Sequence, residues 1–302
     1  MVCEDELMVV FNVVYDFAGS EFEVVSLDGC CLLAFDFEDL GRVSVCSRGS
    51  YVGGEVPYDK YVDALKAGGC LPPPNCDEVL RVLRGAAREN VFSRPRPVYF
   101  ALDTNLLYLR FPTHFLSFSL SGLRIALPEP VLREVSWAAG REEGRVLPLD
   151  VRLAKQALAE YDYVEKKLGA HLVRGEGRGD RAIALALKSF SQGADVVLLT
   201  SDDNMRITAM SEGVATLLVE QQRDPELVRL SYRNLPVVVS SLAVTYSTVK
   251  LETVSPLTVT QVQGWWRGKR NEDWLSRRLR VQTDERIGGM VLRELRAVRG
   301  GA

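Results

Sequence analysis

The stretch Val98-Tyr99-Phe100-Ala101-Leu102-Asp103-Thr104-Asn105 decides the fold that we expect for this chain. Its apolar residues follow Pro97 and are typical of a strand that is buried on both faces of a parallel sheet. Asp103 comes where this strand should end, and a buried carboxylate costs several kcal/mol unless it is paired or holds a cation. Because open α/β sheets bind ligands beyond the carboxyl ends of their strands, Asp103 is predicted to be functional.

Strand and helix patterns alternate in the sequence that follows Pro97. Strands are predicted at Val98–Leu102, Arg124–Leu127, His171–Val173, Asp195–Thr200 and Val214–Val219. Helices are predicted between them at Pro130–Ala139, Leu153–Leu168, Asp180–Ser191 and Asn204–Glu212. This alternation indicates an α/β domain with three layers, α/β/α, around a central parallel sheet.

The sequence before this domain is predicted to be β-rich with additional helices. Short apolar segments separated by glycine-containing turns indicate an antiparallel meander. These segments are Leu7–Tyr15, Glu21–Leu27, Cys31–Phe37 and Arg42–Cys46. Helices are expected at Tyr58–Ala67 and Asp77–Glu89, ahead of a proline-rich linker at residues 93–97.

The sequence after the α/β domain is predicted to be an extension of strands and helices. Val237–Val249 is rich in Val, Ser and Thr and predicts one or two strands. Gly264–Arg299 is expected to be mainly helical and basic, with Asn271 as an N-cap. We therefore expect an N-terminal α+β domain at residues 1–95, the α/β domain at residues 96–235, and a C-terminal extension at residues 236–302.

Composition argues against several classes of protein. The 302 residues carry a formal charge of -3, and 47% of them are hydrophobic, which is enough to form the hydrophobic cores of one large domain or two smaller ones. No apolar run is long enough to span a membrane, and the acidic start is unlike a signal peptide, so a cytoplasmic location is expected. The six cysteines include no CxxC pair, which argues against a zinc site and favours buried thiols.

Four acids fall at matching places in the α/β domain. Asp103 ends the first strand, Glu134 lies in the first helix, Asp180 opens a helix after a glycine-rich loop, and Asp202 follows the fourth strand. If these elements present their ends to one crevice, the four carboxylates converge and repel one another. Mg²⁺ or Mn²⁺ would relieve this repulsion, because hard cations prefer oxygen ligands.

Each acid also has a plainer interpretation. Asp180, and either Asp202 or Asp203, could be only the N-caps of their helices. Glu134 alone could lie on a solvated helix face, and Asp103 alone could make a structural hydrogen bond. The four acids in order form a stronger pattern than any one of them.

Residues 97–220 resemble the PIN domain, a metal-dependent nuclease module. The resemblance rests on four ordered motifs, which are Leu102-Asp103-Thr104-Asn105, Pro128–Val135, Gly179–Ala184 and Leu199–Asn204. It implies that the catalytic metal ligands, direct or through water, are Asp103, Glu134, Asp180 and Asp202. It also implies that the groups orienting these ligands are Asn105, Thr200, Asp203 and Asn204. Asn204 stands where many relatives carry another acid, which weakens the case for a second tightly held ion.

Two basic segments are candidates for contact with RNA. The first is the loop Arg174–Gly179, whose glycines allow close approach of a substrate backbone; the basic residues in and after it are Arg174, Arg178 and Arg181. The second combines rings that can stack on bases with cations that can neutralise phosphates, namely Trp265, Trp266, Arg267, Lys269 and Arg270. The alternative for this second segment is a Trp-anchored strap that packs on the main domain.

These patterns predict a Mg²⁺- or Mn²⁺-dependent endoribonuclease that acts in RNA processing or turnover. The resemblance implies products with a 5′-phosphate and a 3′-hydroxyl, and because PIN relatives often dimerise, a homodimer is a candidate assembly. The alternatives are a non-catalytic RNA-binding or assembly protein, and the toxin ribonuclease of a toxin–antitoxin pair, which the long flanks disfavour. A phosphotransferase of the haloacid-dehalogenase kind is disfavoured because that class needs a second Asp where Asn105 stands.

Overall fold

The chain forms two compact units in a computed structural model. The structure describes residues 1–41, 43–52, 54–91, 96–116, 122–141, 147–223, 225, 228–253 and 258–300. One unit comprises Pro73–Glu143 and Leu153–Gln222, and the other comprises Met1–Pro72, Gly144–Arg152 and Arg223–Ala302. We call the first the α/β unit and the second the antiparallel unit.

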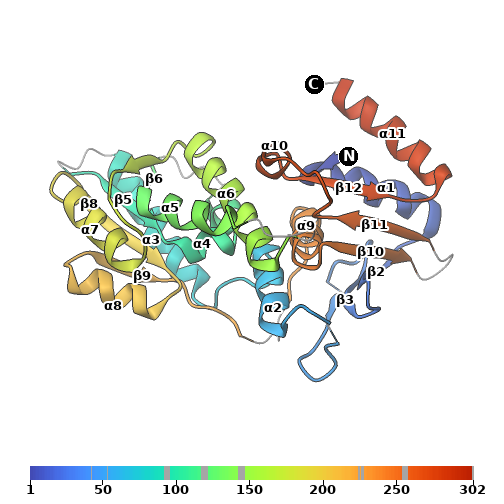
Figure 1. The fold of residues 1–302 in the computed structure, drawn as a ribbon, viewed down its shortest axis with the longest axis horizontal. Helices are drawn as coiled ribbons and strands as arrows, with labels where there is room; N and C mark the ends of the chain where they lie inside the picture. Colours follow the sequence, from blue (N-terminus) through green and yellow to red (C-terminus); the bar gives the residue numbers. More distant parts are fainter. Residues whose placement is uncertain are drawn as a thin grey trace. The chain divides into compact units, whose positions relative to one another are not determined.

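Five parallel strands form the sheet of the α/β unit, in the order β7-β6-β5-β8-β9 (Figure 1). They are β5 (Val98–Leu102), β6 (Arg124–Pro128), β7 (His171–Val173), β8 (Asp195–Thr200) and β9 (Ala215–Leu218). The two central strands, β5 and β8, are in register from Val98 opposite Asp195 to Leu102 opposite Leu199. All carboxyl ends therefore lie at one edge of this sheet, and Asp103 follows the middle strand.

Helices flank the parallel sheet and contribute to a core of Leu, Val, Ile, Ala and Phe side chains. They are α3 (Cys76–Val91), α4 (Thr104–Tyr108), α5 (Glu129–Ala139), α6 (Leu149–Lys166), α7 (Asp180–Phe190) and α8 (Asp203–Ser211). The three-layer α/β/α fold with a central parallel sheet is confirmed. The sequence pattern did not predict the short helix α4 or the π-helical turn Pro112–Leu116, because neither is long enough to show a period.

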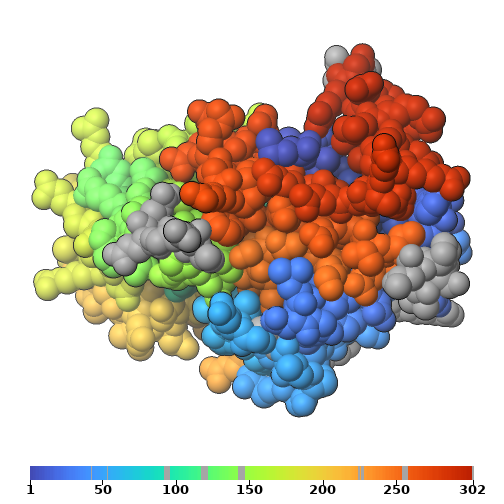
Figure 2. Space-filling view, turned by 45° about the vertical axis from the view of Figure 1, so that its right-hand side comes forward, coloured from blue at the N-terminus to red at the C-terminus, as the bar shows by residue number. Residues whose placement is uncertain are grey.

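Seven antiparallel strands form the sheet of the other unit, in the order β1-β12-β11-β10-β2-β3-β4. They are β1 (Val2–Cys3), β2 (Glu21–Ser26), β3 (Cys31–Asp36), β4 (Val43–Val45), β10 (Thr248–Thr253), β11 (Val259–Gln263) and β12 (Arg278–Gln282). The predicted meander is thus present in β2, β3 and β4. Strand β10 pairs with β2, so segments from the two ends of the chain share one sheet, and Figure 2 shows the N-terminal residues in blue beside the C-terminal residues in red.

The division of the chain differs from the three segments expected at residues 1–95, 96–235 and 236–302. The two flanks form a single unit, because pairing between β2 and β10 connects them across more than two hundred residues. Helix α3 belongs to the α/β unit, where Asn90 bonds to the carbonyls of Val98 and Gly122. Contacts between segments that are distant in sequence therefore determine which unit each flank and helix α3 belong to.

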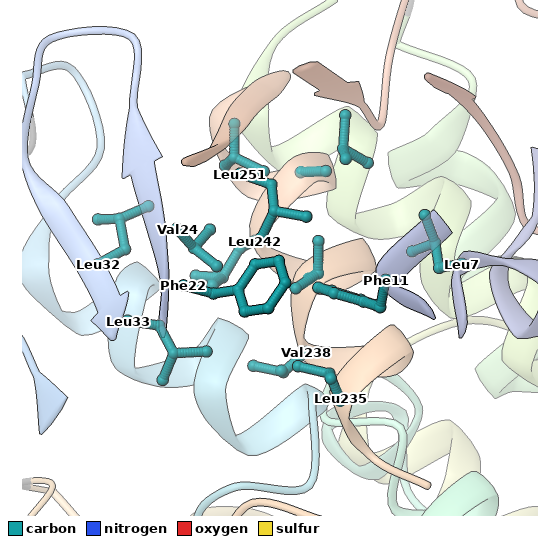
Figure 3. Close-up of a cluster of buried hydrophobic side chains, with 14 of the residues drawn as sticks. Leu7, Phe11, Phe22, Val24, Leu32, Leu33, Leu235, Val238, Leu242 and Leu251 are labelled. Atoms are coloured by element: carbon teal, nitrogen blue, oxygen red, sulfur yellow. The ribbon is translucent and has the colours of Figure 1, made fainter. Parts of the chain in front are cut away.

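Helix α9 (Leu235–Tyr246) lies in the core of the antiparallel unit (Figure 3). Every residue from Leu235 to Thr245 is buried. A helix that is enclosed on all sides has no polar face and therefore lacks the one-sided helical pattern. This is why the strands predicted at Val237–Val249 are wrong up to Tyr246. In the part of the chain that the structure describes, no helix combines the length and the apolar character needed to cross a membrane.

Helix α1 (Leu7–Ala18) corrects a second prediction. A strand was expected at Leu7–Tyr15, but this segment is a helix that buries Leu7, Val10, Phe11, Val13 and Val14. Its many β-branched residues favour a strand by propensity, and burial in the core overrides that preference. Helix α2 (Tyr58–Ala67) lies where the sequence predicted it.

The C-terminal segment is less helical than predicted. Gly264–Arg299 contains the short helix α10 (Asn271–Leu275), then strand β12, and then helix α11 (Glu285–Gly300). Arg270 is the N-cap of α10, and Asn271 is its first helical residue. Strand β12 escaped prediction because it is completed by non-local pairing with β1 and β11.

A buried ion pair holds the chain just beyond Asp103. The Arg110 side chain is 1% exposed, and its Nε lies 3.6 Å from Oε2 of Glu160, which is 0% exposed. Thr113 donates hydrogen bonds to both carboxylate oxygens of Glu160, at 2.7 Å from its backbone nitrogen and 2.8 Å from its hydroxyl. The pair ties the segment after α4 to α6 and thereby stabilises the backbone next to the candidate site.

Replacement of Glu160 by Ala should lower the free energy of unfolding of the α/β unit by about 3 kcal/mol, because the Arg110 charge stays buried without this carboxylate. Urea unfolding followed by circular dichroism measures the loss. The matched control is Asp195→Ala, which removes the partner of Arg96 from an ion pair whose side chains are each 50% exposed. The control should cost less than about 1 kcal/mol. Equal losses in the two variants would contradict the importance of the buried pair.

Candidate metal and active site

Asp103 lies at the carboxyl end of β5 and is 2% exposed. Its Oδ1 accepts a hydrogen bond from the backbone nitrogen of Thr104 at 2.7 Å, so Asp103 is the N-cap of α4. Its Oδ2 accepts a hydrogen bond from the Thr200 hydroxyl at 2.7 Å, and the exposed Asn105 amide lies 3.5 Å away. The backbone nitrogen of Asp103 bonds to the Leu199 carbonyl of β8. These contacts hold the carboxylate in one orientation between the two central strands.

Glu134 lies on α5, the helix that follows β6, and is half-buried. The Thr104 hydroxyl lies 3.3 Å from its Oε2 and donates to it. The backbone of Gly179 lies near this carboxylate and partly offsets the rise that burial causes in its pKa. Thr104 therefore connects two acids, since its backbone bonds to Asp103 and its side chain to Glu134.

Asp180 and Asp202 lie at the starts of α7 and α8, the helices that follow β7 and β8. Asp180 is the first residue of α7. Asp202 is the N-cap of α8 and accepts a hydrogen bond from the Asn204 backbone nitrogen at 2.7 Å. Its own backbone nitrogen donates to the Thr200 hydroxyl at 3.0 Å, so Thr200 links Asp202 to Asp103. Asp202 therefore caps its helix and also lies beside the other acids.

The four carboxylates act on one another electrostatically. Burial raises the pKa of Asp103 from its ordinary value of 3.8 to about 6, and the charges of Asp180 and Glu134 add to this rise. Burial also raises the pKa of Glu134, again with a contribution from Asp180. Burial and then the charge of Asp202 raise the pKa of Asp180. The sheet therefore gathers negative charge at one edge, where each acid is repelled by at least one other.

The donor set suits a hard divalent cation that keeps part of its water shell. The acids offer only oxygen ligands, which Mg²⁺ and Mn²⁺ prefer. Among the described residues, no three His, Cys, Asp or Glu side chains are grouped closely enough to form a ready-made metal cage. Mg²⁺ commonly binds through one or two carboxylates and several waters, so a partial protein shell is compatible with this ion.

The glycine-rich loop between β7 and α7 borders the acids. Gly179 has a φ of 83°, a conformation that residues with side chains rarely adopt. Burial raises the pKa of Glu134, and the positive charge of Arg178 opposes that rise, which indicates that this guanidinium lies near the site. Arg174 is exposed in the same loop, and Arg181 is exposed in the first turn of α7, where its charge also lowers the pKa of Glu212.

Asp203 and Asn204 are placed differently from Asp202. Asp203 is 69% exposed in its side chain, and its Oδ1 accepts a hydrogen bond from Nε of Arg206 at 3.0 Å. Asn204 is exposed and contacts Asp202 through its backbone nitrogen. The structure therefore brings Asp103, Glu134, Asp180 and Asp202 together, with Asn105 and Thr200 beside them, while Asp203 turns to Arg206.

Trp266 and Lys269 are packed inside the antiparallel unit. Trp266 is 7% exposed, and the Lys269 ammonium lies 4.7 Å from the centre of its ring and 3.9 Å from that of Trp274. Lys269 donates to the carbonyls of Gly264 and Arg278 at 2.6 and 2.8 Å. Burial lowers the pKa of Lys269 to about 7. These two residues form the packed strap that the sequence offered as the alternative to an RNA contact.

The other residues of this strap remain at the surface. Trp265 is partly exposed, and Arg267 and Arg270 are exposed. The Arg270 guanidinium lies 3.7 Å from Glu272 and 3.8 Å from Asp273, so its charge already has two acidic neighbours.

Sequence reasoning missed two residues beside the acids. Thr104 was visible as the hydroxyl residue that directly follows Asp103, but its bond to Glu134 depends on the fold. Trp137 follows Glu134 by three residues on α5 and is 54% exposed. Position i+3 places it on the same side of the helix as Glu134, a signal that the sequence contained.

A family comparison agrees with the fold of the α/β unit. The model of the PIN domain family matches residues 100–220, so this part of the chain is a PIN domain, a nuclease-type module that is typically dependent on divalent metals and commonly binds RNA. No curated protein matches the chain. A solved structure, a domain of a functionally unknown protein from Methanocaldococcus jannaschii DSM 2661, is 15% identical and covers 44% of this chain and 99% of its own, with a TM-score of 0.33.

Replacement of Asp103 by Asn should stabilise the metal-free protein at neutral pH. Because the folded pKa lies above the unfolded value, the folded state binds the extra proton, and stability falls as pH rises from about 4 to about 6 and stays low above that range. The difference between the folded and unfolded pKa of Asp103 corresponds to about 3 kcal/mol. We expect the free energy of unfolding of the Asp103→Asn variant at neutral pH to exceed that of the wild-type protein by about 2 kcal/mol.

Urea unfolding in EDTA at several pH values measures this effect. In the Asp103→Asn variant, the free energy of unfolding should fall less with rising pH than in the wild-type protein. Asp195→Asn, at the opposite end of β8, should leave this pH dependence unchanged. A less stable Asp103→Asn protein at neutral pH would show that the carboxylate is a structural hydrogen-bond acceptor only.

Proposed function

We propose that this protein is a Mg²⁺- or Mn²⁺-dependent endoribonuclease that hydrolyses RNA phosphodiester bonds in RNA processing or turnover. The observation that carries the proposal is that buried Asp103 is linked to Glu134 through Thr104 and to Asp202 through Thr200 at the carboxyl edge of the sheet, where the charges of Glu134 and Asp180 also raise its pKa. A buried Asp103 carboxylate beside other acids destabilises the fold, whereas a bound cation would make the same arrangement favourable.

The chain's own residues divide into ligands and orienting groups. Asp103, Glu134, Asp180 and Asp202 would hold the ion, directly or through water. Thr200 and the Thr104 backbone keep the Asp103 carboxylate in place. The Thr104 side chain does the same for Glu134. Asn105 lies at the rim, where its amide is exposed to a substrate.

A bound divalent ion supplies an activated water nucleophile and stabilises charge on the phosphate oxygens. The carboxylates would hold the ion, and their oxygens can accept protons from water. Attack on the phosphorus with release of the 3′ oxygen leaves a 5′-phosphate and a 3′-hydroxyl, the outcome that the family resemblance implies.

RNA would approach over the basic loop of the α/β unit. Arg174, Arg178 and Arg181 are exposed in the loop or just after it, and their charges complement phosphates. We leave Trp266 and Lys269 out of the proposed RNA contact, because both are engaged inside the antiparallel unit. Trp265, Arg267 and Arg270 remain candidates on the surface of that unit.

The test is cleavage of a labelled single-stranded RNA by the full-length protein with Mn²⁺ or Mg²⁺. Asp103→Asn and Asp180→Asn should each slow cleavage by about a hundredfold or more, because the ion loses a ligand. EDTA should abolish cleavage, and added Mn²⁺ should restore it. The matched control is Asp195→Asn, which removes an exposed carboxylate at the amino end of β8 and should cleave at the wild-type rate.

Unchanged cleavage in Asp180→Asn or in EDTA would reject this proposal. Tight RNA binding without cleavage in any divalent metal would instead favour a non-catalytic RNA-binding protein built on the PIN domain. Growth arrest on expression, relieved by a partner gene, would favour a toxin.

A further inference from the structure

Trp137 is an exposed aromatic residue whose ring contacts the guanidinium groups of two arginines. Its side chain lies on α5 and is 54% exposed. The guanidinium carbon of Arg178 lies 4.7 Å from the centre of its ring, and that of Arg141 lies 4.7 Å away as well. The informative feature is therefore the pair of guanidinium groups on one ring, since cations are attracted to the face of an indole.

This cluster lies next to the acids within the α/β unit. Trp137 follows Glu134 by three residues, so both project from neighbouring positions on α5. Arg178 precedes Asp180 by two residues and lies close enough to Glu134 to lower the pKa of that carboxylate. The two arginines come from different segments, the glycine-rich loop and the residues just after α5, and both lie over the Trp137 ring.

The geometry points to a phosphate clamp, in which Trp137 holds Arg141 and Arg178 over its ring so that both guanidinium groups bind the backbone of an RNA strand beside the scissile phosphate. This inference rests on the proposed function for the choice of RNA. Trp137 is a positioning residue in this clamp, and the two arginines are the groups that touch the strand.

The chemistry of arginine explains why the ring is needed. Stacking on an aromatic ring uses the flat face of a guanidinium and leaves its N–H groups at the edge available for hydrogen bonds. Those N–H groups match two oxygens of one phosphate. A flexible arginine loses conformational entropy when it binds, and an arginine already held on a ring loses less. The ring therefore strengthens binding without touching the phosphate.

Charge complementarity also favours a nucleic-acid strand over a protein partner. The acids alone would repel a polyanion, so a strand needs cations close to the site before it can approach. Arg141 and Arg178 supply two such charges at its border. Each phosphate contact releases counterions, which makes the clamp measurable through the salt dependence of binding.

The test is binding of a fluorescein-labelled oligouridine to the full-length protein in EDTA, measured by fluorescence anisotropy over a series of KCl concentrations. Arg141→Ala and Arg178→Ala should each reduce the slope of log affinity against log salt by about 0.7. Trp137→Leu should weaken binding about tenfold, and Trp137→Phe, which keeps a flat ring, should recover most of that loss.

Arg88→Ala is the matched control. Arg88 is exposed on α3, two residues before Asn90, which bonds to residues at the amino ends of β5 and β6. It is therefore at the edge of the sheet opposite to the acids, and its removal should leave the salt slope unchanged.

The outcomes separate the clamp from the nuclease activity, because cleavage is not measured in this assay. Binding with the expected changes in slope supports the clamp even if the protein cuts no RNA. Wild-type slopes in Arg141→Ala and Arg178→Ala, or equal losses in Trp137→Phe and Trp137→Leu, would overturn it even if the protein is an active nuclease. Failure of the wild-type protein to bind the oligouridine would overturn it too.

Discussion

The repulsion between buried Asp103 and the acids around it is the constraint on which the site of the α/β unit depends. Asp103 is enclosed at the end of the middle strand, and the charges of Glu134 and Asp180 act on it. A fold selected for stability alone would place an apolar or neutral residue there. The hydrogen bonds from Thr200 and Thr104 reduce the cost and fix the direction of the carboxylate, but they do not remove the charge.

The parallel sheet is what brings these acids together. Its strands all point the same way, so the residues that follow β5 and β8, the start of α7 after β7 and the first turns of α5 after β6 all lie near one edge. The hydrogen-bond network then couples the elements, since Thr200 of β8 contacts both Asp103 and Asp202. The buried Arg110–Glu160 pair supports the segment immediately beyond Asp103. A site for a hard cation and a phosphate therefore follows from the topology and a few polar contacts.

Local patterns predicted the α/β unit well and the antiparallel unit poorly, for physical reasons. In the α/β unit, strand β5 is visible as a continuous apolar run, and helix α7 shows its helical period within a few residues. Helices α1 and α9 are rich in β-branched residues, and burial decides their conformation. The order of the four acids could be read from sequence, but the bond from Thr104 to Glu134 and the approach of Arg141 and Arg178 to Trp137 need the folded chain.

The most direct test of the central claim is a crystal of the protein soaked in Mn²⁺ and examined by anomalous scattering. We predict a manganese peak among Asp103, Glu134, Asp180 and Asp202, with water in the remaining coordination positions. The peak should disappear from crystals of Asp180→Asn. An empty site at saturating Mn²⁺, or manganese bound only to other residues, would contradict the claim that these carboxylates exist to hold a metal ion.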